Sequence, residues 1–145
     1  MQFYIHPNAD QDLERLSESD EDGVAYIDTV LEMMFENETL FYKLFSERYY
    51  RDYDPPTGTL GIEIKRIACL WGNGIKALRI RFDNESVLKY RVIYCTAAKK
   101  QPDGTYIQEI HILAVVSKEE DGFDYQPEHP IMGRIKNDYF HICAG

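Results

Sequence analysis

The sequence of 145 residues contains little cysteine, no long hydrophobic run and fewer basic than acidic side chains. Three cysteines, at positions 69, 95 and 143, are an odd number at wide spacings, which is typical neither of a disulfide framework nor of a zinc motif. We therefore expect free thiols. Apolar runs are shorter than a membrane span, and the N-terminus lacks the basic and hydrophobic regions of a signal peptide. These absences predict a cytoplasmic protein without a membrane partner.

The deficit of basic residues argues at first against a nucleic-acid partner, because phosphate binding depends on clustered Lys and Arg. The net charge is −9. Its distribution is uneven: residues 1–60 contain 4 basic and 14 acidic residues, residues 61–101 contain 9 and 3, and residues 102–145 contain 3 and 8. The cations are therefore concentrated in one segment. Such asymmetry indicates either a basic binding surface on an acidic body or solvated charges on a sheet face.

The centre of the basic segment, residues 75–94, has the alternation of a β-hairpin. The inward positions are Leu78, Ile80 and Phe82 in the first arm and Leu88, Tyr90, Val92 and Tyr94 in the second. Arg79 and Arg81 then lie on the other face, as do Lys89, Arg91 and Ile93, and the polar residues 83–86 supply the turn. The pattern predicts that Arg79, Arg81 and Arg91 converge on one exposed sheet surface.

The first third of the chain predicts a strand and two helices. Residues 3–5 form the strand, which ends at His6-Pro7, and Asn8 is the expected N-cap of the first helix. The two predicted apolar stripes are Ala9, Leu13 and Leu16, then Val24, Ile27, Leu31, Met34 and Phe35. The acidic residues 17–22 separate them and place Asp20 or Asp22 at the positive end of the second helix. The two helices are expected to form a hairpin.

Residues 37–60 are rich in aromatic side chains and are expected to be an insertion. Leu40, Phe41, Leu44 and Phe45 suit a short helix, whereas the Pro-Pro and Gly of residues 55–58 require a loop. Exposed tyrosines in this segment are candidates for stacking on bases. The alternative is that the aromatic side chains simply pack the insertion onto the core.

The remaining chain predicts further strands and a last helix. A strand is expected over residues 62–70 and a central one over 106–116, whose two faces are Ile110, Ile112, Ala114 and Val116 against Leu113 and Val115. A loop follows over 121–130. A short helix carries Ile131, Met132, Ile135 and Tyr139. The prediction is one α+β domain over residues 1–145, with an N-terminal strand and a helical hairpin packed on a small, mostly antiparallel sheet.

This order, with several local strings, resembles the RelE/ParE toxin superfamily and most of all its RelE/HigB-like type II toxins. Residues 3–13 are similar to the opening strand and helix start of that family. Residues 78–82 and 90–94 are similar to its paired central strands, and residues 112–118 to its last strand, which ends in a basic residue. The resemblance implies a RelE-like fold. It leaves residues 37–60 and most of the C-terminal segment unmatched.

The resemblance implies a toxin that cleaves mRNA in the ribosomal A site without a metal ion or cofactor. In such a reaction the ribose 2′-OH attacks the adjacent phosphate, which requires a base, cations and an acid. The corresponding residues here are Arg79 and Arg81 on the first central strand, Arg91 on the second, Lys118 after the last strand and Tyr125 toward the C-terminus. The implied partners are a cognate antitoxin protein, mRNA and the ribosome.

Two other functions remain open from the sequence. One is a non-catalytic interaction domain with the same fold that binds a protein partner, with the three arginines as a site for an acidic peptide. The other is an inhibitor of DNA gyrase of the ParE type, which does not need the basic catalytic set. His111 shares the face of the arginines if the strand register holds, and His129 and His141 are further titratable groups. The four histidines have no metal-binding spacing.

Overall fold

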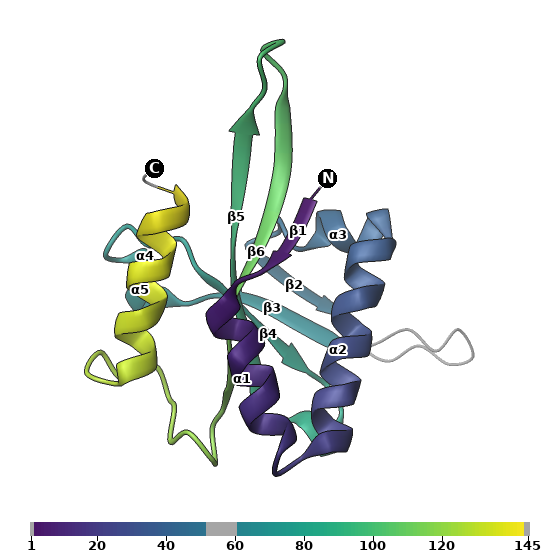
Figure 1. Ribbon diagram of the computed structural model, residues 1–145, viewed down its shortest axis with the longest axis vertical. Helices are drawn as coiled ribbons and strands as arrows, with labels where there is room; N and C mark the ends of the chain where they lie inside the picture. The colour runs from purple at the N-terminus through teal and green to yellow at the C-terminus, as the bar shows by residue number, and fades with distance from the viewer. Residues whose placement is uncertain (1, 52–60, 144–145) are drawn as a thin grey trace.

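The computed structural model describes residues 2–51 and 61–143. Its elements follow the order β1 (Gln2–Ile5), α1 (Pro7–Ser17), α2 (Glu21–Glu36), α3 (Glu38–Lys43), β2 (Arg48–Arg51), β3 (Ile62–Arg66), α4 (Ala68–Trp71), β4 (Leu78–Phe82), a 3-10 turn (Glu85–Val87), β5 (Tyr90–Lys100), β6 (Tyr106–Ser117) and α5 (Pro130–Cys143). This is the predicted α+β class, with an N-terminal strand, a helical hairpin and a mostly antiparallel sheet (Figure 1).

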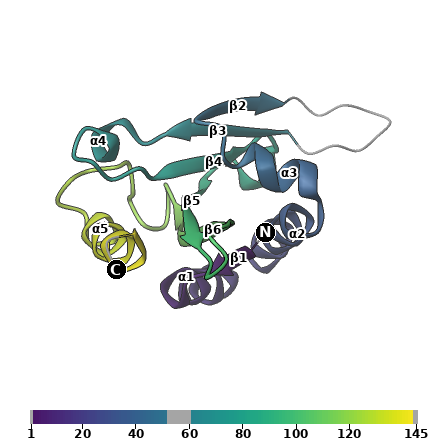
Figure 2. The same ribbon diagram turned by 90° about the horizontal axis from the view of Figure 1, so that it is seen from above.

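One twisted sheet organises the domain. Its strand order is β1-β6-β5-β4-β3-β2, and only the pairing of β1 with β6 is parallel among the described strands. Helices α1 to α3 lie on one side of the sheet and α5 on the other, with α4 beside the ends of β3 and β4 (Figure 2). A buried apolar cluster fills each side. The sheet therefore has a helical-hairpin face and an α5 face, and the site residues are described below by these names.

The start of α1 differs from the prediction by two residues. His6, rather than Asn8, is the N-cap: its imidazole Nδ1 accepts a hydrogen bond from the Asn8 N–H at 3.0 Å. Pro7 follows at the first helical position, where its missing N–H leaves no intrahelical bond unmade. Asn8 instead donates to Asp138 of α5 at 2.8 Å, and so helps to hold the two helices together.

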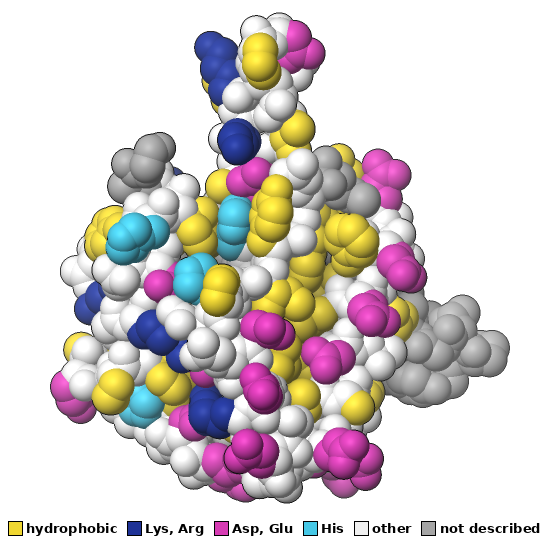
Figure 3. Space-filling model, in the orientation of Figure 1, with side chains coloured by type: hydrophobic (Ala, Val, Ile, Leu, Met, Phe, Trp, Pro, Cys, Tyr) yellow, Lys and Arg dark blue, Asp and Glu magenta, His cyan; other side chains and the backbone are white. Residues whose placement is uncertain are grey.

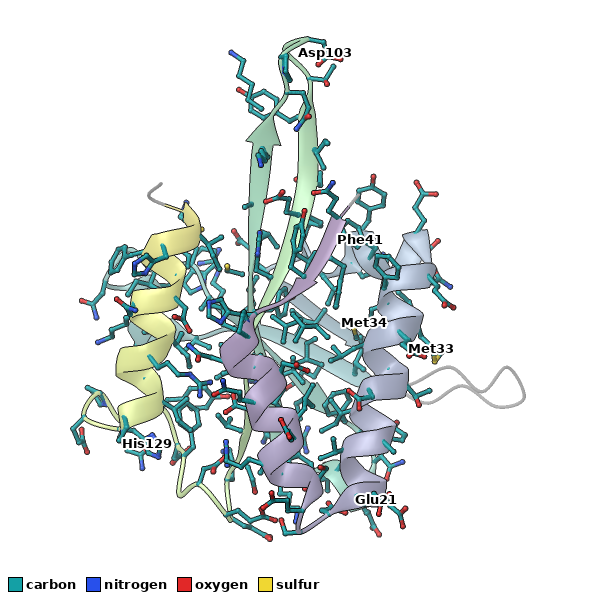
Figure 4. The ribbon with its side chains drawn as sticks, in the orientation of Figure 1. Glu21, Met33, Met34, Phe41, Asp103 and His129 are labelled. Carbon is teal, nitrogen blue, oxygen red and sulfur yellow. The ribbon has the colours of Figure 1, made fainter. Side chains whose placement is uncertain are left out.

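Helix α2 presents the predicted stripe to the sheet, with one exception. Met34 points inward and is buried, whereas its neighbour Met33 points away from the sheet (Figure 4). Val24, Ile27 and Leu31 are buried as expected. Phe35, however, is 50% exposed. The expectation of a fully buried stripe is wrong at this position, and the exposed ring becomes important below.

Residues 37–51 contribute to the core and to the sheet. Phe41 and Leu44, in and after α3, are fully buried against the helical-hairpin face (Figure 4). The Tyr94 hydroxyl donates to the Leu44 carbonyl at 2.7 Å, which fixes the end of α3 to β5. β2, which the sequence did not predict, pairs with β3. The loop expected at residues 55–58 lies outside the described residues.

The strand expected over residues 62–70 ends early, at Arg66. Ile62 and Ile64 face the helical-hairpin side, as the alternation predicts. The backbone then turns into α4, and Ile67 and Leu70 pack on the α5 face instead. Gly74, with a φ of 78°, completes the turn toward β4, in the left-handed region that glycine adopts without strain.

The alternation of side chains between the two faces of the sheet is interrupted partway along β6. Ile93 pairs with Ala114 and Tyr94 with Ile112, so Leu113 is an extra residue without a partner, a β-bulge. Ile112 and Val115 consequently face the helical-hairpin side, and Ala114 packs on the α5 face together with Leu113. The predicted division of this strand by strict alternation is wrong because the bulge shifts the parity by one residue.

Strands β5 and β6 continue beyond the rest of the sheet as a two-stranded arm, with Asp103 in the turn at its tip (Figures 1 and 4). The Asp103 carboxylate accepts hydrogen bonds from the backbone N–H and the hydroxyl of Thr105, at 2.9 and 2.6 Å. Gly104, with a φ of 88°, supplies the turn conformation. The arm is therefore a locally stabilised hairpin.

A buried carboxylate, Asp12, links α1, α5 and β6. It is 2% exposed and accepts two hydrogen bonds from Arg134 of α5, at 2.9 and 2.5 Å, and one from Arg15 at 3.1 Å. It also accepts the Val115 N–H of β6 at 3.0 Å. β1 ends opposite Ile112, so Asp12 takes the place of a strand partner for the Val115 backbone.

Asp20, the N-cap of α2, couples the helix to the sheet and makes a pH-dependent contribution to stability. Its carboxylate accepts the Tyr90 hydroxyl at 2.7 Å and the Gly23 N–H at 3.1 Å. The hydrogen bond from Tyr90, followed by that from Gly23, lowers the pKa of Asp20. A lowered folded-state pKa contributes stability above the unfolded value of about 3.9, and this contribution is lost as the pH falls through the folded value.

We expect Asp20→Asn to be less stable than the wild type at pH 7 and to lose less stability between pH 5 and pH 3, because its side chain does not titrate. Because asparagine caps a helix about as well as aspartate, the expected loss of about 1 kcal/mol comes from the weaker hydrogen bond between Tyr90 and an uncharged acceptor. Urea unfolding at the two pH values measures both effects. Asp22→Asn, an exposed substitution two residues away, is the matched control. Equal pH dependence in Asp20→Asn and the wild type contradicts the assignment.

Candidate functional site

Three cationic side chains lie together on the α5 face of β4 and β5. Arg81 of β4 is paired directly with Arg91 of β5, and Arg79 follows on the same face two residues before Arg81. On the other side of β4, β3 places Glu63 opposite Arg81 and Lys65 opposite Arg79. We call these five residues the cationic cluster. Like charges directly opposite on a sheet repel each other, and the single carboxylate of Glu63 does not balance the four cations, so the cluster keeps a net positive charge.

Arg91 is not on an exposed surface, and the prediction is wrong in this respect. It is 9% exposed, and its Nη1 donates to the carbonyls of Leu88 and Tyr90 at 2.6 and 2.8 Å. Burial, reinforced by the charges of Arg79 and Arg81, lowers the pKa of Arg91. The physical reason is that the α5 face is covered by α5 and by the loop before it, which the strand pattern alone does not reveal.

Glu63 is a member of the cluster that the sequence reasoning did not single out. Its Oε1 accepts a hydrogen bond from Arg79 Nη2 at 2.8 Å, and Lys65 lies 3.8 Å from the same oxygen. The hydrogen bond from Arg79 lowers the pKa of Glu63, with a further contribution from the charges of Lys65 and Arg81. The signal was present in the alternation of residues 62–65, which places Glu63 and Lys65 on the face opposite Ile62 and Ile64.

Arg81 differs from its two neighbours in having no internal acceptor among the described side chains. Arg79 has a salt bridge to Glu63 and Arg91 has two carbonyls. Arg81 is half-buried and contributes only longer-range charge effects on Glu63 and Arg91. Its guanidinium is therefore the member of the cluster most available to bind an anion.

Tyr125 reaches the cluster from the loop between β6 and α5. Its ring packs edge-on against the buried Phe123 at 5.1 Å between centroids. Its backbone φ is 61°, a left-handed conformation that is a genuine outlier for a bulky residue and costs about 1–2 kcal/mol. Residues held in this way are concentrated at functional sites.

The Tyr125 hydroxyl is buried and makes no hydrogen bond of ordinary geometry within the described residues, although it lies close enough to the Arg91 guanidinium to interact with it. Burial raises the pKa of Tyr125, and the nearby charges of Arg79 and Arg91 oppose that effect. The hydroxyl is thus a protonated donor close to two guanidinium groups. A buried polar group without a partner calls for a functional or structural explanation, and a ligand that enters the cluster is one.

Lys118 lies at the edge of the same region. Its backbone N–H donates to the Lys89 carbonyl at 2.8 Å, immediately after β6 ends. Its Nζ lies 6.0 Å from the centroid of the Tyr125 ring and 3.2 Å from an Asp124 carboxylate oxygen. The fold therefore brings all five predicted site residues, Arg79, Arg81, Arg91, Lys118 and Tyr125, to one end of the α5 face.

The histidines considered from the sequence have other surroundings. His111 does share the face of Arg91, but it stacks on Tyr4 at 5.0 Å and lies 3.0 Å from Glu109. His129 packs against Phe123 and contacts the Asp121 carbonyl at 2.7 Å, and His141 contacts the Asn137 carbonyl in its own helix. Within the described residues, no three His, Cys, Asp or Glu side chains are arranged to hold a metal ion.

The cationic cluster supplies guanidinium groups and a carboxylate, and Tyr125 adds a phenol beside them, which is a set suited to binding and protonating a phosphate ester. No helix in the described parts of the chain is both long and apolar enough to cross a bilayer. Comparison with protein-family models, with curated proteins and with solved structures found no match to this chain. The geometry of the cluster therefore carries the functional argument.

Proposed function

We propose that this protein is a RelE-like toxin of a type II toxin–antitoxin system that cleaves mRNA on the ribosome without a metal ion. The observation that supports the proposal most strongly is the convergence of the five residues that the resemblance implied. They come from β4, β5 and the segment after β6, up to 46 positions apart in the sequence. Their sequence spacing does not require them to meet.

The reaction assigns different roles to the cations and to the phenol. Attack of the ribose 2′-oxygen on the adjacent phosphorus forms a 2′,3′-cyclic phosphate and releases the 5′-oxygen of the next nucleotide. Arg81 and Arg91 stabilise the negative charge that develops on the phosphoryl oxygens. A tyrosine is protonated at neutral pH, and burial raises the pKa of Tyr125 further; Tyr125 donates that proton to the departing 5′-oxygen.

Glu63 is the carboxylate within the cluster and takes the role of proton acceptor for the 2′-OH. It lies opposite Arg81 in register. Because Arg79 lowers the pKa of Glu63, it is a weak base. We therefore assign most of the rate enhancement to the cations and to the positioning of the phosphate, with the proton acceptor contributing less.

Expression of the chain alone tests the proposal, with growth and the 5′ ends of cellular mRNA as the two measurements. We expect growth arrest together with new mRNA 5′ ends. Tyr125→Phe should lower cleavage by about 10²–10⁴-fold, the usual contribution of a general acid, while the protein stays folded, because the ring keeps its packing against Phe123 and the deleted hydroxyl makes no hydrogen bond of ordinary geometry within the described structure. Tyr106→Phe, on the exposed part of the arm, is the control.

The two remaining functions predict different results in the same experiment. Growth arrest with intact mRNA contradicts the nuclease and favours the gyrase-type inhibitor. Absence of growth arrest contradicts a toxin of either kind and favours the non-catalytic binding domain. That alternative has support of its own, because Arg79 and Arg91 already have internal acceptors and need no catalytic role to explain their positions.

A further inference from the structure

A groove with apolar walls and acidic rims runs along the helical-hairpin face, away from the cationic cluster. Its upper part, a hollow of about 340 Å³, lies between β1 and the second half of α2; its lower part, about 320 Å³, lies between α1 and the first half of α2. Asp28 lines both parts. Figure 3 shows a strip of hydrophobic side chains between the two helices, with Asp and Glu on either side.

The walls of the upper part are apolar and accessible. Ile5 of β1 is 40% exposed and Phe35 of α2 is 50% exposed. Phe3 packs edge-on against Phe35 at 6.1 Å between centroids, and Leu31 closes the bottom. Adjacent exposed apolar side chains rimmed by polar residues mark interaction sites on otherwise soluble surfaces.

The rims carry four carboxylates, Asp10 and Glu14 on α1 and Asp28 and Glu32 on α2. None of the four forms a salt bridge with a described Lys, Arg or His residue. Burial raises the pKa of Asp28, and the charges of Asp10 and Glu32 raise it further. The carboxylates therefore act on one another across the groove without an internal cation to neutralise them.

The spacing of these acids is unfavourable for the isolated helices. Asp10 precedes Glu14 by four residues, and Asp28 precedes Glu32 by four. Like charges at this separation lie on the same helix surface and destabilise it by about 0.2–0.5 kcal/mol per pair. A partner that brings cations to both rims relieves this repulsion more fully than screening by solvent and salt does.

We propose that this groove binds a cationic amphipathic helix of a partner protein. The α2 residues that line the groove extend from Val24 to Phe35. At 1.5 Å per residue this is a length of about 16 Å, which matches about three turns of a bound helix. Apolar side chains at i, i+4 and i+7 of that helix fill the strip, and flanking Lys or Arg residues pair with the rims. β1 is too short, at four residues, to make addition of a strand the better mode.

This inference does not depend on the ribonuclease proposal. The groove and the cationic cluster lie on opposite faces of the sheet, so either one can be functional without the other. A binding measurement with no RNA present therefore tests the groove alone, and its result leaves the proposed function unaffected.

The test uses a synthetic 16-residue peptide with leucines on one helical stripe and lysines elsewhere, labelled for fluorescence anisotropy. We expect saturable binding to the full-length protein. The double variant Asp28→Lys, Glu32→Lys should weaken binding at least tenfold, and Phe35→Ser should weaken it comparably through the lost apolar contact. The control is Glu119→Lys, Glu128→Lys, which changes the net charge equally at exposed positions elsewhere and should bind like the wild type.

Three results overturn the proposal. The first is equal binding of a peptide with serines in place of the leucines, which indicates attraction by charge alone. The second is equal loss of binding in the control variant. The third is a dimer of the free protein that Phe35→Ser dissociates in light scattering, which assigns the groove to a second copy of the chain. Circular dichroism of each variant confirms that it is folded before binding is compared.

Discussion

Arg81→Ala is expected to lower RNA cleavage by about 10²–10³-fold, the usual cost of removing one group that stabilises transition-state charge. It is also expected to leave the fold intact. Arg81 has no internal acceptor among the described side chains, and its removal reduces the repulsion with Arg91 directly opposite. Cleavage of mRNA in a translation extract measures the first effect, and urea unfolding measures the second.

Arg66→Ala is the matched control for this prediction. Arg66 pairs with Leu78 and therefore lies on the opposite face of the same sheet, where its guanidinium stacks on Trp71 at 4.3 Å. The two variants lose the same charge, so a general electrostatic effect would reduce both activities equally. An equal reduction contradicts the assignment of Arg81 to the site. Arg91→Ala is a poorer test, because Arg91 is buried and its loss also removes hydrogen bonds to two carbonyls.

Asp12→Ala is expected to destabilise the protein more than any other single exchange considered, by about 3–5 kcal/mol. Removing the buried carboxylate takes the shared partner from the guanidinium groups of Arg134 and Arg15, which are 27% and 43% exposed, and the Val115 N–H loses its acceptor. The loss is a large fraction of a typical domain stability of about 5–15 kcal/mol. The unfolding midpoint in urea measures it.

Two further variants serve as controls for the Asp12→Ala measurement. Asp10→Ala removes an exposed carboxylate from the same helix and is expected to change the stability by no more than about 0.5 kcal/mol. Asp12→Asn retains an oxygen that can accept the Val115 N–H but loses the charge that pairs with Arg134, so it should fall between the two. If Asp12→Ala and Asp10→Ala are equally stable, the network does not hold α5 to α1.

Local patterns predicted much of this fold correctly. The alternation of residues 78–82 and 90–94 gave two paired strands with Ile80 and Val92 on the helical-hairpin face, and the spacing of Ala9, Leu13 and Leu16 gave the buried stripe of α1. Both patterns arise from side chains within one element, where the backbone geometry alone determines which residues share a face. The charge distribution likewise located the cationic segment.

Long-range contacts account for the misplaced residues. Leu113 is one more apolar residue in an apolar strand, and no local signal shows that it forms a bulge. Ile93 and Arg91 were placed on an exposed face because the alternation does not report that a helix 40 residues later covers it. Asp12 did carry a signal: it lies three residues after Ala9 and four before Leu16, inside the apolar stripe. An acidic residue at such a position indicates a buried partner.

The approach of Lys118 and Tyr125 to the cationic cluster followed from the sequence only through the resemblance. The strand pattern predicted the common face of Arg79, Arg81 and Arg91, but Lys118 and Tyr125 lie in a different segment with no periodicity that relates them to it. Their approach depends on how the chain turns after β6, where Phe123 is buried and Tyr125 adopts its left-handed conformation. Neither property is encoded by composition or spacing.

The sheet separates the acidic groove from the cationic cluster, so local charges of opposite sign lie on opposite faces of the sheet. At physiological ionic strength the field of a charge decays over about 8 Å, so a polyanion near the surface is affected by the face that it meets more than by the net charge of −9. Such a polyanion is attracted more by the face that carries the arginines than by the groove face. Orientation during approach, rather than overall attraction, is thus the way in which an acidic protein can present a basic site to an anionic surface.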